Sequence, residues 1–134
     1  MRLLLSFLLA FWFPAISIAQ KKVFNCEILR KSIERKEFSQ QFFLDKYNED
    51  ITIVDTGGYF NYCQPLYVGN RKAIIYHDTC FLTKEHAIII YNTQNYAKSS
   101  VIHFFRKCSN TSLEIEYKTK GEKVKIISAL RGIF

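Results

Sequence analysis

The side chains best suited to chemistry in this sequence are those of four cysteines and three histidines. The cysteines are Cys26, Cys63, Cys80 and Cys108, and the histidines are His77, His86 and His103. Thiol catalysis needs a thiolate beside an imidazole, so one of these histidines would have to approach Cys80 or Cys108. Nothing in the local sequence marks either cysteine as a nucleophile, and the spacing alone does not predict a cysteine enzyme.

The cysteine count favours disulfide bonds over catalysis or metal binding. An even number of cysteines in a chain that begins with an export signal (see below) is typical of a disulfide framework, and we predict that all four are oxidised. The three pairings stay open at this point. Zinc is the competing interpretation, but the chain has no Cys-x-x-Cys pair, and His77 with Cys80 is a weak signal alone. We therefore predict neither a metal site nor a cofactor.

A group of carboxylates lies around the first expected strand, 51–54, and offers general acid–base chemistry. Its members are Asp45, Glu49, Asp50 and Asp55. We interpret them as a solvated acidic loop, because the chain has no Gly-x-Ser-x-Gly or His-Glu-x-x-His string and no phosphate-binding glycine loop. His103 lies between two apolar residues, and we expect it to be partly buried and hydrogen-bonded. The sequence therefore favours a protein that is not an enzyme.

Aromatic residues gather on both sides of Cys63. They are Tyr59, Phe60, Tyr62 and Tyr67. Most aromatic side chains of a sheet protein lie in its core, and that is the interpretation preferred here. A small-ligand groove lined by a few of these rings is the alternative.

The first nineteen residues have the pattern of a cleavable signal peptide. Arg2 precedes an apolar run over 3–13, Pro14 follows, and Ser17 and Ala19 are the small residues expected before a cut at Gln20. An uncleaved anchor is the alternative, but the apolar stretch is shorter than the roughly 20 residues of a spanning helix. We therefore predict a secreted or periplasmic protein with one mature domain over 20–134. Its net charge is 18 minus 12, or +6, because Arg2 is removed.

Hydrophobic periodicity predicts helix first and strands afterwards. Cys26, Leu29 and Ile33 recur at helical spacing and indicate a helix over 24–36, with a second short helix from Phe38. Short β-branched or apolar runs then predict strands over 51–54, 73–77, 87–91 and 101–105. Residues 92–100 are expected to form a polar connector.

The C-terminal segment predicts a β-hairpin. Apolar and polar residues alternate on both sides of a two-residue loop that begins at Gly121. This register places Tyr117 opposite Ile126 and Leu113 opposite Leu130. The residues expected to face the core are Leu113, Ile115, Tyr117, Val124, Ile126 and Leu130. Together these elements predict an α+β fold in which an N-terminal helix or helix pair packs on a four- to six-stranded antiparallel meander sheet.

Four lysines of the hairpin form the candidate binding site. They are Lys118, Lys120, Lys123 and Lys125, and the register places Lys118 opposite Lys125 and Lys120 opposite Lys123. Like charges directly opposed are destabilising, so the retention of these lysines needs a reason, and one interpretation is binding to an anionic partner such as an acidic protein, a lipid headgroup surface or an envelope polymer. Nucleic acid is excluded as a partner, because the chain has an export signal and no recognition motif. The interpretation preferred here is a solvated face that deters edge-to-edge pairing, with nearby Glu114, Glu116 and Glu122 relieving part of the repulsion.

These features predict a small exported protein that binds another macromolecule without catalysis, as inhibitor, immunity or accessory proteins do. The alternative is a ligand-binding or enzymatic module with a pocket between helix and sheet. A filled core favours the first, whereas a deep cavity lined by tyrosines with a histidine–carboxylate pair favours the second.

Overall fold

The structure, a computed structural model, describes residues 26–60, 63, 65–121 and 123–133. The predicted signal peptide, 1–19, lies outside these residues. The helices are α1 (Cys26–Ile33) and α2 (Lys36–Gln41), with 3-10 turns η1 (Leu44–Lys46), η2 (Thr79–Thr83) and η3 (Lys107–Ser109). The strands are β1 (Ile51–Val54), β2 (Leu66–Val68), β3 (Arg71–Tyr76), β4 (Ile88–Asn95), β5 (Ser100–Arg106), β6 (Thr111–Lys120) and β7 (Lys123–Ile133).

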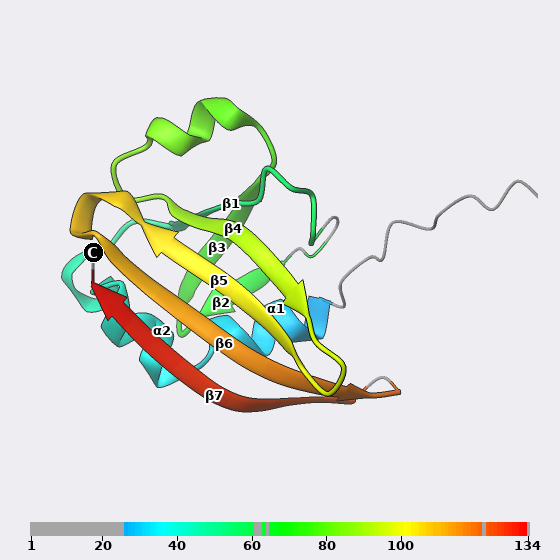
Figure 1. The fold of residues 1–134 in the computed structure, drawn as a ribbon. Helices are drawn as coiled ribbons and strands as arrows, with labels where there is room; N and C mark the ends of the chain where they lie inside the picture. The colour runs from blue at the N-terminus through cyan, green and yellow to red at the C-terminus, as the bar shows by residue number, and fades with distance from the viewer. Residues whose placement is uncertain (1–25, 61–62, 64, 122, 134) are drawn as a thin grey trace, which may run out of the picture.

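The strands form one curled, seven-stranded sheet in the order β2-β3-β1-β4-β5-β6-β7 (Figure 1). The sheet is mixed, because β1 runs parallel to both of its neighbours, β3 and β4. The strands from β4 to β7 pair in antiparallel fashion, each with the next. The predicted α+β fold with a four- to six-stranded antiparallel meander is therefore wrong, and the described chain is mostly sheet with two short α-helices.

Strand β1 accounts for the difference. Every residue over 51–54 is buried, as is typical of a strand covered on both faces within a parallel pairing. A short apolar run without alternation fixes neither the direction of a strand nor its neighbours. After β1 the chain runs through 55–65 to the edge hairpin of β2 and β3, and β3 then pairs with β1 in parallel.

Two short helices cover one face of the sheet (Figure 1). The helix expected over 24–36 is interrupted, because Arg35 adopts an extended backbone before α2 begins. Leu29 and Ile33 are fully buried, as their spacing predicted. In the part of the chain that the structure describes, no helix has the length and apolar character needed to span a membrane.

The tip of the β6–β7 hairpin has the predicted register. Gly121 begins the loop between the strands with φ at +61°, a conformation that glycine adopts without steric cost. Tyr117 lies opposite Ile126, as expected. Tyr117 and Val124 are buried, so this part of the hairpin presents its apolar face to the core.

A β-bulge changes the pairing farther along β7. Ile127 has no partner in β6, and the strands are shifted by one residue beyond it. Leu113 consequently lies opposite Arg131 and not opposite Leu130. Leu130 is 64% exposed, so the prediction that it faces the core is wrong. A shift of one residue turns each side chain to the other face of a sheet.

Candidate functional site

The four candidate lysines lie on the free end of the β6–β7 hairpin, which we call the lysine arm (residues 118–125). Lys118 lies opposite Lys125 and Lys120 opposite Lys123, as predicted, and all four side chains are exposed. Strand β5 begins at Ser100, opposite Tyr117, so β6 continues past the last residue that β5 can pair with. The arm therefore projects beyond the neighbouring strand (Figure 1).

The other face of the arm is held against helix α1. Val124 is buried in the core cluster, and its backbone carbonyl accepts a hydrogen bond of 2.7 Å from Lys31 Nζ. Cross-strand pairs have side chains on the same face, so the lysines share the face opposite to Val124. The helix thus fixes the arm from one side and leaves the lysines in solvent.

Acidic residues near the arm are bound elsewhere. Glu116 accepts hydrogen bonds from the hydroxyls of Ser99 and Ser128, at 2.5 and 3.2 Å, and Glu114 lies 3.1 Å from His103 Nδ1. Among the residues that the structure describes, no carboxylate forms an ion pair with any of the four lysines. Within residues 118–125 the arm has four lysines and one acidic residue, Glu122, which lies outside the described residues, so its net charge is positive.

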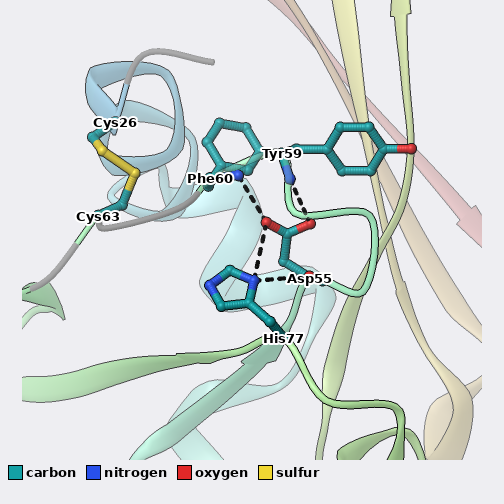
Figure 2. Close-up of polar contacts among 6 residues, drawn as sticks. All are labelled: Cys26, Asp55, Tyr59, Phe60, Cys63 and His77. Atoms are coloured by element: carbon teal, nitrogen blue, oxygen red, sulfur yellow. Dashed lines mark hydrogen bonds and ion pairs between the residues drawn. A yellow bond between two sulfur atoms is a disulfide. The ribbon is translucent and has the colours of Figure 1, made fainter. Parts of the chain in front are cut away.

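One disulfide is present, between Cys26 and Cys63 (Figure 2). It joins the first turn of α1 to the segment between β1 and β2. Cys80 and Cys108 are free and exposed in the structure, so a second bridge stays a prediction. The neighbouring Asp78 raises the pKa of the Cys80 thiol above its ordinary value, through a hydrogen bond to that thiol. Cys80 is therefore a weak nucleophile at neutral pH.

The structure brings one of the cysteines considered for thiol catalysis, Cys108, close to one of the histidines, His86. Cys108 Sγ lies 3.9 Å from His86 Nδ1, because Ile88 in β4 lies opposite Arg106 in β5 and the residues before and after them remain close. The ring of His86 packs against Tyr47, with 4.2 Å between the ring centroids. The contact is long for a hydrogen bond, and aromatic packing explains the position of the imidazole.

A carboxylate–histidine pair is found where the sequence did not predict one. Asp55 follows β1 and His77 follows β3, and these parallel strands end side by side. The Asp55 carboxylate accepts hydrogen bonds from the backbone N–H groups of Tyr59 and Phe60, at 3.1 and 2.7 Å. His77 Nδ1 lies 3.0 Å from the Asp55 carbonyl oxygen and 3.8 Å from its carboxylate (Figure 2).

Asp55 differs from the solvated acidic loop to which the sequence assigned it. Asp45, Glu49 and Asp50 are exposed, whereas Asp55 has no accessible surface. Its carboxylate is used to fix the loop that leads towards Cys63, so we interpret the residue as structural. His77 Nε2 points away from Asp55 (Figure 2). The sequence feature that could have revealed this pair is that Asp55 and His77 each directly follow a short apolar run.

His103 is the partly buried, hydrogen-bonded histidine that the sequence predicted. It is 8% exposed, and its Nδ1 lies 3.1 Å from Glu114 Oε1 and 3.4 Å from the Tyr91 hydroxyl. Burial, with a smaller contribution from Glu114, raises the pKa of Tyr91. His103 lies on the sheet face that the helices leave uncovered, since the residue before it, Ile102, faces the core.

The aromatic residues near Cys63 point in different directions. Phe60 is in the core, and Tyr59 packs against the core from its edge. Tyr67 is 51% exposed on the edge strand β2, and Tyr62 lies outside the described residues. Tyr59 and Phe60 diverge from the backbone near Asp55 (Figure 2), so these described rings do not line one shared groove.

Comparisons with protein-family models, with curated proteins and with solved structures find no match to this chain. A function therefore has to be inferred from the side chains themselves. Among the candidates described above, the lysine arm is the feature that packing and hydrogen bonding do not explain.

Proposed function

We propose that this protein is a small, exported, non-catalytic binding domain whose lysine arm docks onto an anionic macromolecule. The inhibitor, immunity and accessory classes fit this description. Export rests on the signal-peptide pattern of residues 1–19 and agrees with the Cys26–Cys63 disulfide.

The observation that supports the proposal is the pairing of lysine with lysine twice along one projecting hairpin. Each pair opposes like charges directly, which destabilises a hairpin by a few tenths of a kcal/mol to about 1 kcal/mol. An anionic partner removes that repulsion when it binds. A positive patch also increases the rate of encounter with an anionic surface.

The alternative of a pocket between helix and sheet has less support. Fully buried side chains occupy that layer, among them Leu29, Ile33 and Phe38. Phe38 makes edge-to-face contacts with Phe42 and Phe104, at centroid distances of 5.0 and 5.2 Å. Because these side chains fill the layer between helix and sheet, we expect a partner to bind to the outer surface of the domain.

The test is a charge-removal variant of the mature chain, with its disulfide intact, in which Lys118, Lys120, Lys123 and Lys125 are changed to Gln. The probes are heparin, poly-glutamate and phosphatidylglycerol vesicles. The matched control loses the same number of charges at exposed lysines elsewhere, at Lys36, Lys46, Lys72 and Lys107.

We expect the arm variant to lose at least tenfold in affinity for one or more of these probes, and the control to lose clearly less. Binding by the natural chain should weaken steeply from low salt to 0.15 M, where charges are screened within about 8 Å. Equal affinities of the arm variant and the control would show that the lysines only solvate the hairpin, and the proposal would fail.

A further inference from the structure

A polar groove lies beside the lysine arm. Its volume is about 180 Å³, and it opens between the β4–β5 turn, residues 95–100, and the β6 segment over 117–119. The two segments are neighbours because Ser100 at the start of β5 lies opposite Tyr117. Figure 1 shows the β4–β5 turn next to the end of the β6–β7 hairpin. Lys118 lines the groove and also belongs to the lysine arm, so the two meet at this residue.

Most of the residues that line the groove have side chains with a hydroxyl or amide group. They include Asn95, Tyr96, Ser99, Ser100 and Thr119. The Ser100 hydroxyl donates to the Asn95 side chain at 2.7 Å, and the Tyr96 backbone N–H donates to the Ser99 carbonyl at 2.8 Å. These bonds hold the lining in a defined arrangement, and each hydroxyl oxygen keeps the capacity to accept a further hydrogen bond.

Charge and an exposed ring lie at the rim. Lys98 and Lys118 both contribute to the groove, and Lys118 is also the first lysine of the arm. Tyr96 is 58% exposed, and its hydroxyl donates a hydrogen bond to the Gln94 side chain at 2.5 Å. Positively charged side chains, hydroxyl groups and one exposed tyrosine thus lie close to one another around the groove.

We propose that this groove holds one sugar unit of an anionic glycan, and that the lysine arm binds the sulfate, phosphate or carboxylate groups of the adjacent units. This inference rests on the proposed function and names the partner class. A sugar ring offers several hydroxyls that donate and accept, which match the hydroxyl and amide lining. The exposed Tyr96 side chain adds a contact to the sugar.

Other anionic partners fit the groove less well. A flat membrane surface contacts projecting lysines but does not fill a hollow lined by hydroxyls. An acidic peptide brings apolar side chains, and Ala97 is the one aliphatic side chain in the lining of this groove. The groove is also small compared with pockets for drug-sized ligands, which are about 300–1,000 Å³, and this suits a single polar unit of a longer chain.

The experiment compares Tyr96→Ala with Tyr67→Ala, which removes a similarly exposed tyrosine from β2, far along the sheet order from the groove. Thr119→Val is the second groove variant, because it replaces a hydroxyl by a methyl group of the same shape. The probes are heparin, a sulfated glycan, and poly-glutamate, an anion without sugars. Circular dichroism and thermal unfolding confirm that each variant is folded.

We expect each groove variant to bind heparin about threefold to tenfold more weakly, the effect of losing one hydrogen bond or one ring contact. Binding of poly-glutamate should change by less than twofold, and Tyr67→Ala should leave both affinities unchanged. Unlike the four-lysine variant, the groove variants should keep the salt dependence of binding, since no charge is removed.

Three outcomes overturn the inference and leave the proposed function intact. If the groove variants bind heparin normally while the four-lysine variant does not, the arm acts without the groove. If the groove variants lose heparin and poly-glutamate equally, the groove binds anions and not sugars. Binding by the natural chain to phosphatidylglycerol vesicles but to neither soluble polyanion would assign the arm to a lipid surface.

Discussion

On one side of β4 the sheet contains β1, β2 and β3, and on the other side it contains β5, β6 and β7 (Figure 1). The first half includes parallel pairs and long connections, and it is fixed by the Cys26–Cys63 bridge and by the buried carboxylate of Asp55. The second half is antiparallel, and its long hairpin ends in four exposed lysines.

The difference shows how each half maintains its shape. Parallel neighbouring strands need connections that leave the sheet and return. In the first half, the Cys26–Cys63 disulfide and the buried Asp55 carboxylate order these connections. Consecutive antiparallel strands are joined directly, and their backbone ladder and core-facing side chains suffice. The end of the second half carries four exposed lysines beyond the last strand pair with β5.

The largest expected effect comes from the disulfide. Changing both Cys26 and Cys63 to Ser should lower the free energy of unfolding by about 4 kcal/mol, because the bridge joins residues separated by 37 positions. Chemical denaturation of the oxidised protein measures this. The Cys80→Ser, Cys108→Ser double variant tests the second bridge that the sequence predicts: it costs less than about 0.5 kcal/mol if these thiols are free, as they are in the structure. A loss near that of the first variant would reveal a second bridge in the oxidised protein.

In the antiparallel half, the largest effect should come from the core face of β6. Ile115 is fully buried, so Ile115→Ala should cost about 3 kcal/mol. Ile127, the bulge residue, is 44% exposed, and Ile127→Ala should cost less than about 1 kcal/mol. Urea titration of both variants gives the two values. Similar losses would mean that the bulge lies elsewhere and that the pairing of β7 is wrong.

A smaller loss is expected from Asp55→Asn. An amide of the same shape cannot accept both backbone hydrogen bonds as a charge does, so we expect a cost of about 2 kcal/mol. Asp50→Asn, at an exposed position of the same region, should change stability by less than about 0.5 kcal/mol. If the two substitutions have the same effect, the buried carboxylate does not order the first half.

The smallest effect should have the opposite sign. Replacing Lys118 and Lys123 by Gln removes one charge from each cross-strand pair and should stabilise the fold by a few tenths of a kcal/mol. Thermal unfolding at low and high salt measures this, and the gain should shrink as salt screens the repulsion. A loss of stability instead would mean that the lysines serve the fold, which weakens the case for a partner.

The two halves also differ in what the sequence could predict. The register at the tip of the β6–β7 hairpin depends on local alternation and on Gly121, and it was predicted down to the two lysine pairs. The bulge was missed, because two consecutive isoleucines, Ile126 and Ile127, fit the alternating pattern equally well until the opposite strand is known. Leu130 was consequently assigned to the wrong face.

The candidate sites follow the same division. The lysine arm could be predicted because its residues are neighbours in one hairpin. The pair of Asp55 and His77 could not, because it depends on the parallel pairing of β1 with β3, which a short apolar run does not specify. The groove beside the arm was missed as well, since residues 92–100 were expected to form a connector and β4 instead continues to Asn95.

The central place of β1 has a consequence for how the chain reaches its native state. Ile53 pairs with Ile75 on one side and with Ile88 on the other, and both partners are synthesised later. Until β4 is available, the first strand has at least one unpaired edge and apolar side chains on both faces, which favour association with other chains. Contacts between residues far apart in sequence also slow folding, into the range of milliseconds to seconds for sheet proteins. Refolding yield should therefore depend strongly on protein concentration, and the interval before β4 forms is when a chaperone would be needed.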